Sequence, residues 1–287
     1  MEYTHPEALV STEWLAENLG ASDIAIVDAS FHMPAANRNA KEEFADSHIP
    51  GAVFFDIDDI CDSESDLPHM VPSAAKFSSR MRSLGIGSEH HVIAYDINGG
   101  CAAAMRAWWM LRLFGHDRVS VLNGGLEKWL AGGRDVENKV PEIVEKHFFA
   151  KLDDSLLRTV DQIKANVESG AEQLIDARSA GRFDGSEPDP RPNVKPGHIP
   201  GSLNLPFQEL LNTTHYMMMR PANELQAVIE TAGIDPEKSV ISSCGSGVTA
   251  APLVMALYLL GFTRAAIYDG SWSEWGSRDD TSIETRA

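Results

Sequence analysis

The chain has 287 residues, 43% of them hydrophobic and 23% charged, and its formal net charge is −18. This composition is typical of a soluble globular protein, and the negative charge argues against nucleic acid or an anionic membrane as a partner. No apolar run reaches the ~18 residues that would span a bilayer, and the acidic N-terminal stretch MEYTHPEALV lacks the pattern of a signal peptide.

The cysteines and histidines set further limits. The three cysteines, Cys61, Cys101 and Cys244, are too few and too scattered for a disulfide framework, which indicates a reducing cytoplasm. Neither they nor the ten histidines show a metal-ligand spacing, so the sequence predicts no metal and no cofactor. We interpret Cys61 and Cys101 as structural residues.

In chain order, the first half predicts a series of alternating strands and helices. An apolar strand ends at Asp28 and is followed by the motif HIPG, which contains His48. A second strand ends at Asp96, and the long apolar helix after it is closed by Gly115, the residue type expected just past a helix. A third strand and a short helix containing Trp129 complete the series.

The second half repeats the same series. Its counterparts of those five residues, in the same order, are Asp176, His198, Cys244, Gly261 and Trp275. Alternating strands and helices predict βαβ units, and hence a mainly parallel sheet with helices on both faces. We therefore predict an α/β fold of two tandem domains, residues 1–138 and 155–287, joined by a charged linker over residues 139–154 that does not align between the copies.

The stretch CGSGVTA, which begins at Cys244, is where the two halves differ in chemistry. Cys244 falls opposite Asp96, and a turn that only joined a strand to a helix would not need a thiol. Gly245 and Gly247 free the backbone, so that successive N–H groups can point at one centre and favour an anion such as a thiolate. We expect the helix to begin near Gly247 or Val248, and the C-terminal domain to be the active one. The alternative is a buried structural cysteine in a tight turn.

A reactive thiol in such a turn is compatible with several chemistries. A tyrosine-phosphatase-like site would need an arginine six positions after the cysteine, where this chain has Ala250. A cysteine hydrolase would need a histidine base, and only folding could bring His69 or His198 to the thiol. The pattern favours a loop that holds a polarisable sulfur anion while the charge of the substrate is bound elsewhere.

Several motifs together resemble a known family. They are CGSGVTA (244–250), the paired HIPG motifs, GRFDGSEPDPR (181–191), FFDIDDIC (54–61), PHM (68–70) and YDGSWSEW (268–275). From about residue 5 to about residue 276, the chain resembles the 3-mercaptopyruvate sulfurtransferases of the two-domain rhodanese superfamily. The resemblance implies two tandem rhodanese-like domains, the first of which has Asp96 at the position of the catalytic cysteine.

The resemblance also implies an activity. In this family the thiolate, here that of Cys244, takes the sulfur of 3-mercaptopyruvate and releases pyruvate through its enolate. The resulting persulfide passes its outer sulfur to an acceptor such as thioredoxin, a small dithiol or cyanide. The thiosulfate-using rhodaneses typically carry an arginine and a lysine where this chain has Gly245 and Ser246, so the resemblance favours 3-mercaptopyruvate as the donor.

The resemblance assigns substrate binding to two arginines. Arg182 and Arg191 bind the carboxylate and the ketone, within a stretch whose prolines and glycine indicate an ordered, non-helical excursion. The alternative is a surface loop whose arginines neutralise Asp184, Glu187 and Asp189. The loop residues that the resemblance adds to the substrate site are Gly245, Gly247, Val248 and Thr249.

A proton relay is the last element that the resemblance implies. It consists of Asp58, His69 and Ser246. Because the first two lie in the N-terminal half, we expect the active site in the cleft between the domains. On the residues alone, His69 is equally well an ordinary loop histidine, and Asp58 a cap or first-turn acid of a helix.

Two other functions stay open at this point, a thiosulfate:cyanide sulfurtransferase and a persulfide carrier with little turnover of its own. Outside the site, we interpret His48 and His198 as residues that fix the turn before a strand. For the three methionines at 217–219 the sequence offers no physical account beyond a mobile rim near the cleft.

Overall fold

The computed structural model describes residues 2–33, 36–97, 103–235 and 237–285. Its first half contains a five-stranded sheet in which all neighbouring strands are parallel. In spatial order the strands are β1 (Leu9–Val10), β5 (Val119–Leu122), β4 (His91–Tyr95), β2 (Ile24–Asp28) and β3 (Val53–Phe54).

The second half contains another five-stranded parallel sheet with an equivalent order of strands. These are β6 (Leu157–Arg158), β12 (Ala265–Tyr268), β11 (Val240–Ser243), β7 (Gln173–Asp176) and β8 (Leu203–Asn204). A separate antiparallel pair, β9 (Leu211–Asn212) with β10 (Met218–Met219), has no equivalent among the described residues of the first half. The predicted fold of two tandem α/β domains is confirmed.

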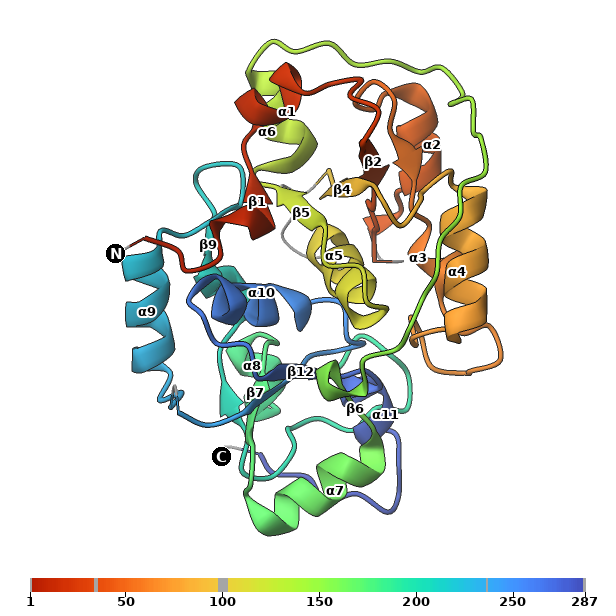
Figure 1. Ribbon diagram of the computed structural model, residues 1–287. Helices are drawn as coiled ribbons and strands as arrows, with labels where there is room; N and C mark the ends of the chain where they lie inside the picture. The colour runs from red at the N-terminus through yellow and green to blue at the C-terminus, as the bar shows by residue number, and fades with distance from the viewer. Residues whose placement is uncertain (1, 34–35, 98–102, 236, 286–287) are drawn as a thin grey trace.

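Helices cover both faces of the first sheet (Figure 1). In chain order they are α1 (Thr12–Glu17), α2 (Ala40–Asp46), α3 (Ile57–Ile60), α4 (Ala74–Ser83), α5 (Ala103–Leu113) and α6 (Gly125–Ala131). The apolar sides of α4 and α5 lie on the face turned toward the second half, and those of α1 and α6 lie on the opposite face. A 3₁₀ turn over Pro6–Ala8 precedes β1.

The second sheet is covered in the same manner. Its helices are α7 (Val160–Ser169), α8 (Ala180–Asp184), α9 (Ala222–Thr231), α10 (Ala251–Leu259) and α11 (Ser271–Trp275), with 3₁₀ turns at Asp154–Leu156 and Phe207–Leu210. The helices α9 and α10 face the first half, whereas α7 and α11 cover the outer face. The predicted helix ends at Gly115 and Gly261 are confirmed, because both residues follow their helices with positive φ of 79° and 92°.

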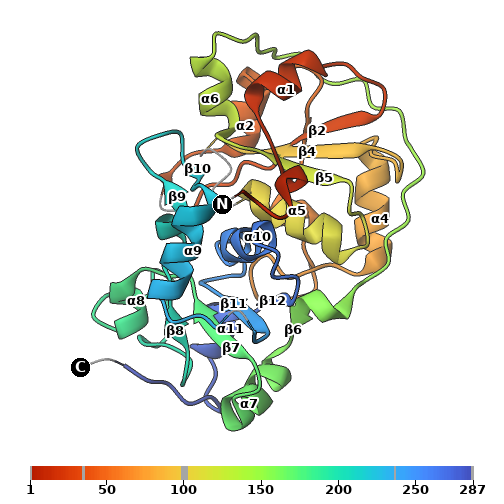
Figure 2. The ribbon, with the colours of Figure 1, turned by 60° about the vertical axis from the view of Figure 1, so that its left-hand side comes forward.

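One hydrophobic core joins the two halves. The helices α5 and α10 lie side by side between the two sheets in both ribbon views (Figures 1 and 2). Across this contact, the ring centroids of Trp108 and Tyr258 are 5.4 Å apart. The sequence of α10, APLVMALYL, is apolar on all sides, as expected of a helix buried between two layers.

The repeated HIPG motifs fold into the same turn in both halves. The His48 ring stacks on Phe44 with centroids 4.1 Å apart, and the His198 ring stacks on Phe183 at 3.7 Å. The Nδ1 atom of each ring lies 2.7 Å from the carbonyl oxygen of that phenylalanine. A short antiparallel bridge closes each turn. The interpretation of these histidines as residues that fix a strand-entry turn is therefore confirmed.

The segment between the halves runs without regular secondary structure down the right-hand side of Figure 1. The bridge from His48 to Glu137 holds its start against the first half, and the second sheet begins with β6. We retain the boundaries 1–138 and 155–287, with a linker over 139–154, as a proposal that these positions support.

The N-terminal arm crosses over to the second half (Figure 2). The N–H of Thr4 donates to the carbonyl of Leu259 at 2.7 Å, and the hydroxyl of Tyr3 donates to the carbonyl of Arg220 at 2.5 Å. A Cβ added at Gly261 would lie 3.2 Å from the Thr4 side chain. The start of the chain therefore packs over the C-terminal end of α10.

Candidate active site

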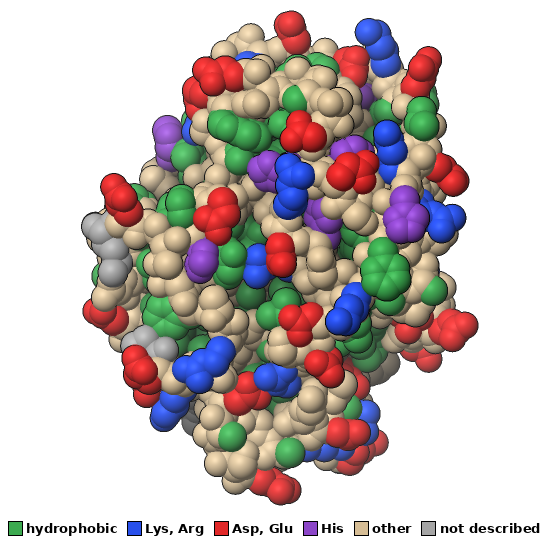
Figure 3. Space-filling model, viewed as in Figure 1, with side chains coloured by type: hydrophobic (Ala, Val, Ile, Leu, Met, Phe, Trp, Pro, Cys, Tyr) green, Lys and Arg blue, Asp and Glu red, His purple; other side chains and the backbone are tan. Residues whose placement is uncertain are grey.

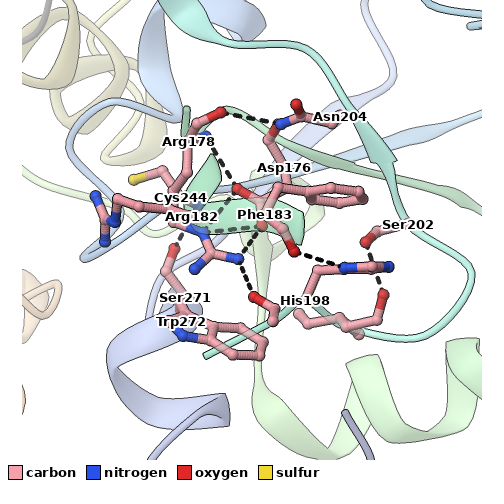
Figure 4. A network of polar contacts seen from close by, with 12 residues as sticks. Asp176, Arg178, Arg182, Phe183, His198, Ser202, Asn204, Cys244, Ser271 and Trp272 are labelled. Atoms are coloured by element: carbon pink, nitrogen blue, oxygen red, sulfur yellow. Dashed lines mark hydrogen bonds and ion pairs between the residues drawn. The ribbon is translucent and has the colours of Figure 1, made fainter. Parts of the chain in front are cut away.

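Cys244 directly follows β11, which lies between β12 and β7 in the second sheet. The carboxyl ends of parallel strands are where α/β proteins bind ligands. The side chain is buried, with 1% exposure. The N–H of Cys244 donates to Ser271 Oγ at 3.1 Å, and its carbonyl accepts from the N–H of Trp272 at 3.0 Å, so that the start of α11 holds the residue in place (Figure 4).

The two glycines of the cysteine turn are required by close contacts. Gly247 has a φ of +77°, and a Cβ there would lie 2.9 Å from the carbonyl oxygen of Asp269. A Cβ at Gly245 would lie 3.0 Å from Nη1 of Arg191 and 3.3 Å from Nη2 of Arg182. The helix α10 begins only at Ala251, so the prediction of a start near Gly247 or Val248 is wrong: the curled turn continues to residue 250 before helical geometry begins.

The backbone of this turn has unused donors. Among the described residues, the N–H groups of residues 245–250 have no acceptor, although all of these residues except Thr249 are buried. Buried N–H groups are almost always paired in native proteins, and successive unpaired ones form an anion-binding concavity. The turn therefore presents a row of donors beside the Cys244 thiol.

Arg182 and Arg191 come together at the same turn. Arg182 Nη2 lies 2.5 Å from Asp189 Oδ2, and the N–H of Arg191 donates to Asp189 Oδ1 at 3.0 Å. Burial of Asp189 acts to raise the pKa of its carboxyl, but the hydrogen bonds and charges of the two arginines outweigh it and lower the pKa. The two arginines converge as predicted, and both also contact Asp189, as the alternative interpretation expected. The Asp189 carboxylate therefore holds the two guanidinium groups near one another.

The stretch between the two arginines is non-helical, as predicted. The short helix α8 spans Ala180–Asp184 and carries Arg182, and the intervening residues 185–190 form no helix. The helix ends where Gly185 takes a positive φ of 83°, and only the proline-containing remainder is irregular.

The structure brings Asp58, His69 and Ser246 together across the two halves. His69 Nδ1 lies 3.2 Å from Ser246 Oγ, and His69 Nε2 lies 3.2 Å from Asp58 Oδ1. The His69 hydrogen bond lowers the pKa of Asp58, so this carboxylate is ionised and accepts from Nε2–H. In neutral His69, Nδ1 is then free to accept the proton of the Ser246 hydroxyl.

Two groups that the sequence analysis missed hold this arrangement. Arg106 of α5 is fully buried and donates from Nη2 to Asp269 Oδ1 at 2.6 Å and to the carbonyl of His69 at 2.9 Å. Its Nη1 donates to the carbonyl of Gly247 at 3.4 Å, and Asp269 Oδ2 accepts from the N–H of Val71 at 2.6 Å. One guanidinium thus ties the His69 loop to the cysteine turn. A lone arginine within the apolar run AAAMRAWWML was the sign that a buried partner is needed.

A cavity of about 530 Å³ lies between the halves. The second half lines it with Arg182, Arg191 and the turn residues Gly245, Ser246, Val248 and Thr249, and the first half lines it with the segment around Phe31 and Arg38. Asp58, His69, Gly247 and Cys244 are not among its lining residues. The Phe31 ring packs edge-on against the His69 ring, with centroids 4.8 Å apart.

The remaining predicted residues lie as follows. Cys61 is half-buried at the end of α3 and donates from Sγ to the carbonyl of Asp58 at 3.0 Å, and burial raises the pKa of its thiol. Cys101 lies outside the described residues. Met219 is buried in β10, and its N–H donates to Asn123 Oδ1 of the first half at 3.0 Å. The interpretation of the methionines as a mobile rim is therefore wrong for this residue, which anchors the β9–β10 hairpin to the first half.

Within the ranges that the structure describes, no three or more His, Cys, Asp or Glu side chains are grouped so as to hold a metal ion. None of the described helices combines the length and the apolar character needed to cross a membrane.

Comparisons with known proteins agree with this geometry. A family model described as a rhodanese-like domain matches the chain twice, over residues 11–132 and 159–278. The chain is 42% identical to "3-mercaptopyruvate sulfurtransferase" of Escherichia coli (strain K12), with 96% of this chain and 97% of that protein covered. It is also 42% identical to "Thiosulfate/3-mercaptopyruvate sulfurtransferase 1, mitochondrial" of Arabidopsis thaliana, with 97% and 78% covered.

A solved structure is similar over nearly its whole length. It is the crystal structure of SseA from Escherichia coli, described under the "Rhodanese" fold and catalytic mechanism of 3-mercaptopyruvate sulfotransferases. The TM-score is 0.84 at 39% sequence identity, with 92% of this chain and 98% of that chain covered. Two matched domains, two equivalent sheets and a thiol at the end of β11 lead to one conclusion: the chain belongs to the rhodanese family.

Proposed function

We propose that this protein is a sulfurtransferase that moves the sulfur of 3-mercaptopyruvate, through a persulfide on Cys244, to a thiol or cyanide acceptor. The observation that carries the proposal is the convergence of Arg182 and Arg191 on Gly245, the residue that follows Cys244. A 2-keto acid has a carboxylate next to a ketone, and two adjacent guanidinium groups can bind both. The substrate's sulfur, two bonds beyond the ketone carbon, then reaches toward Cys244.

The first half-reaction balances within the site. The Cys244 thiolate attacks the substrate sulfur, an S–S bond forms, and the C–S bond breaks with its electron pair on carbon. The leaving group is the enolate of pyruvate, whose negative oxygen is stabilised by the arginines. Formation of the S–S bond oxidises the two sulfur atoms, and the electron pair of the broken C–S bond reduces the substrate carbon, so no external oxidant or reductant is needed. The proton lost by Cys244 balances the proton gained by the enolate carbon.

The relay supplies the path for that proton. Ser246 Oγ, adjacent to the reacting groups, can pass a proton to His69 Nδ1, while ionised Asp58 stabilises the imidazolium that forms. Roles for these three residues are proposed on the strength of the two 3.2 Å contacts.

The turn accounts for the stability of the intermediate. A persulfide is an anion that extends one sulfur beyond Cys244 Sγ, and the unpaired N–H groups of residues 245–250 are the donors suited to hold it. Gly245 and Gly247 shape this concavity, and Val248 and Thr249 complete its wall. In the second half-reaction, thioredoxin, a small dithiol or cyanide takes the outer sulfur and regenerates the thiolate.

Thiosulfate is the competing donor. The arginine pair beside Gly245 would also attract a dianion, and the Arabidopsis relative is named for both donors. Against thiosulfate stands the absence of cations in the turn itself, CGSGVTA. We therefore place 3-mercaptopyruvate first.

The deciding experiment measures pyruvate release from 3-mercaptopyruvate with a dithiol acceptor, beside thiosulfate with cyanide. Intact mass is recorded after donor without acceptor. We expect a strong preference for 3-mercaptopyruvate and a gain of one sulfur atom. Preference for thiosulfate would overturn the donor, and a mass gain without turnover would mean a sulfur carrier.

We also propose the cytoplasm as the location, on the strength of the few, scattered cysteines. Fractionation of cells that express the tagged full chain tests this. Recovery in an oxidising or organellar fraction would contradict it.

A further inference from the structure

We propose that the first half of the chain carries a binding site for the sulfur acceptor, in which Arg38 binds the carboxylate of a small carboxylate-bearing thiol. The site is the wall of the active-site cavity formed by Phe31, Met33 and Arg38. The inference rests on the proposed function, because an acceptor is needed only when a persulfide is formed.

The cavity is larger than the donor requires. At the roughly 30 Å³ that one water molecule occupies in the liquid, a donor of about seven non-hydrogen atoms fills at most about 210 Å³. The cavity measures about 530 Å³. The donor's groups are matched by Arg182 and Arg191 on the second half, so the surplus volume leaves room for a second molecule at the wall that the first half supplies.

Arg38 is held in position at that wall. Its Nε donates to Glu43 Oε1 at 2.6 Å and its Nη2 donates to Glu43 Oε2 at 2.9 Å, while His32 Nε2 lies 2.8 Å from the same Oε2. The Arg38 hydrogen bond lowers the pKa of Glu43, which keeps the anchoring carboxylate ionised. Glu43 does not line the cavity. Among the described residues, Arg38 Nη1 has no partner, so the N–H donors of this nitrogen remain available to a ligand.

The charge of the cavity contrasts with that of the protein. The chain has a net charge of −18, and acidic side chains spread over both halves of the face in Figure 3. Arg38, Arg182 and Arg191 nevertheless line a single cavity, and within the described ranges their carboxylate partners are Glu43 and Asp189 alone. A cationic cavity in an acidic protein concentrates small anions and disfavours acidic protein surfaces. This favours a small anionic thiol over an acidic partner protein.

The apolar part of the wall suits the rest of such a molecule. Met33 is 44% exposed and Phe31 lies beside it, and both line the cavity. A thiol and a carboxylate joined by a few methylene groups would place its carbon chain against these side chains. Its sulfur would then point toward the cysteine turn on the opposite wall.

The transfer step is balanced. The acceptor thiolate attacks the outer sulfur of the Cys244 persulfide, a new S–S bond forms on the acceptor, and the old S–S bond breaks with its electron pair on Cys244. The acceptor's proton ends on Cys244 or in solvent. One sulfur atom is transferred and no external oxidant or reductant takes part.

The test isolates the second half-reaction. Enzyme is loaded with sulfur by 3-mercaptopyruvate, or in parallel by inorganic polysulfide, freed of donor and mixed rapidly with 3-mercaptopropionate or 2-mercaptoethanol. The wild-type to Arg38→Gln ratio of second-order rate constants is taken for each thiol, which cancels their different intrinsic reactivities. We expect a ratio of about five for 3-mercaptopropionate, as fits one half-exposed ion pair, and a ratio near one for 2-mercaptoethanol.

Arg118→Gln is the matched control, because Arg118 is an exposed arginine of the first half that pairs with Asp23 away from the cavity. It should leave both ratios near one. Equal ratios for the two thiols in Arg38→Gln would overturn the acceptor site. The acceptor site would also be overturned if Arg182→Gln, and not Arg38→Gln, slowed 3-mercaptopropionate more than 2-mercaptoethanol. That result would mean that the acceptor binds at the donor's site. Failure to load with 3-mercaptopyruvate would overturn the proposed donor, while the polysulfide-loaded enzyme still tests Arg38.

Discussion

The positions after β4 and after β11 are equivalent in the two sheets, yet they carry Asp96 and Cys244. Their surroundings match: the Asp96 carbonyl accepts from the N–H of Leu126 as the Cys244 carbonyl accepts from the N–H of Trp272. The side chains do different work. Asp96 Oδ2 accepts from the N–H of Ala104 in the helix that follows, whereas the turn after Cys244 keeps its N–H groups unpaired among the described residues. Equivalent backbone positions thus cap a helix in one half and, in the other half, begin the turn that we propose to bind the persulfide anion.

A second pair of equivalent residues differs in the same direction. Asp28 and Asp176 end β2 and β7, and each accepts from a backbone N–H two residues later. Asp176 also forms a two-oxygen ion pair with the buried Arg178 (Figure 4), but the residue at that place in the first half is Ser30. In the second half, Asp176 pairs with Arg178, and Asp189 pairs with Arg182 and Arg191. The first half instead provides Asp58 and His69, the acid and the histidine of the proposed relay.

The largest effect should come from exchanging the residues of the first pair. We expect Cys244→Ser to remove both turnover and the gain of one sulfur atom, whereas Cys61→Ser should retain both. Adding Asp96→Cys to Cys244→Ser should restore neither, because Arg182 and Ser246 lie beside the other turn. Intact mass and pyruvate release provide the readout. A sulfur gain on the introduced cysteine would show that the halves remain functionally equivalent.

The next largest effect should come from breaking the contact between the halves that Arg106 and Asp269 form. Arg106→Gln leaves Asp269 buried and unpaired, and we expect it to lower the free energy of unfolding by about 3–5 kcal/mol. The double variant Arg106→Gln with Asp269→Asn removes the unpaired charge and should recover much of this stability. Its kcat should stay low, since the His69 carbonyl has lost its donor. Urea unfolding and kcat are measured for the single and the double variant. If the double variant recovered kcat as well as stability, the role of Arg106 would be structural only.

Replacing the strand-end carboxylates Asp176 and Asp28 by asparagine should change the free energy of unfolding in opposite directions. Asp176→Asn weakens the pairing of buried Arg178, and we expect a loss of about 2–3 kcal/mol. Burial raises the pKa of Asp28, so its contribution to stability is present below the unfolded value of ~3.9 and is lost as the pH rises through the folded value. Asp28→Asn, which remains neutral, should therefore gain stability relative to wild type between pH 3 and pH 7. Unfolding at both pH values measures this, and equal losses for the two variants would contradict it.

The relay should show the smallest effect. We expect Ser246→Ala to lower kcat less than about tenfold, because a water molecule in the cavity can replace the hydroxyl. The Asp58→Asn effect should not add to it, since both act through His69. A double-mutant cycle on kcat measures the coupling. Additive effects would mean that Asp58 and Ser246 do not share one proton path.

Much of the site followed from patterns within each half. The repeat placed Cys244 at a strand end, and parallel sheets bring such ends to one edge. Motif resemblance supplied His69 and Arg182, which the structure brings to the cysteine turn. These residues could be predicted because each is fixed by local sequence or by a motif.

Contacts between the halves could not be predicted in the same way. The ion pair of Arg106 and Asp269 joins residues 163 positions apart, and the way two domains dock is not encoded in the periodicity of either. The late start of α10 was missed because glycine permits both a helix and the curled turn that replaces its first residues. Local propensity does not decide between the helix and the turn. The close approach of Asp269 to Gly247, which leaves no room for a Cβ, favours the turn.

The N-terminal arm also has a consequence for biosynthesis. Synthesis reaches Tyr3 217 positions before its partner Arg220, and it reaches Thr4 long before its partner Leu259. Domains generally fold in order of synthesis, so the first sheet can form before the binding partners of its N-terminal arm have been made. His69 of the proposed relay likewise has no Ser246 to contact until the second half has been made. A nascent chain interrupted before β11 would therefore lack Cys244 and the strand that positions it, so the proposed sulfur chemistry could begin only after β11 has emerged.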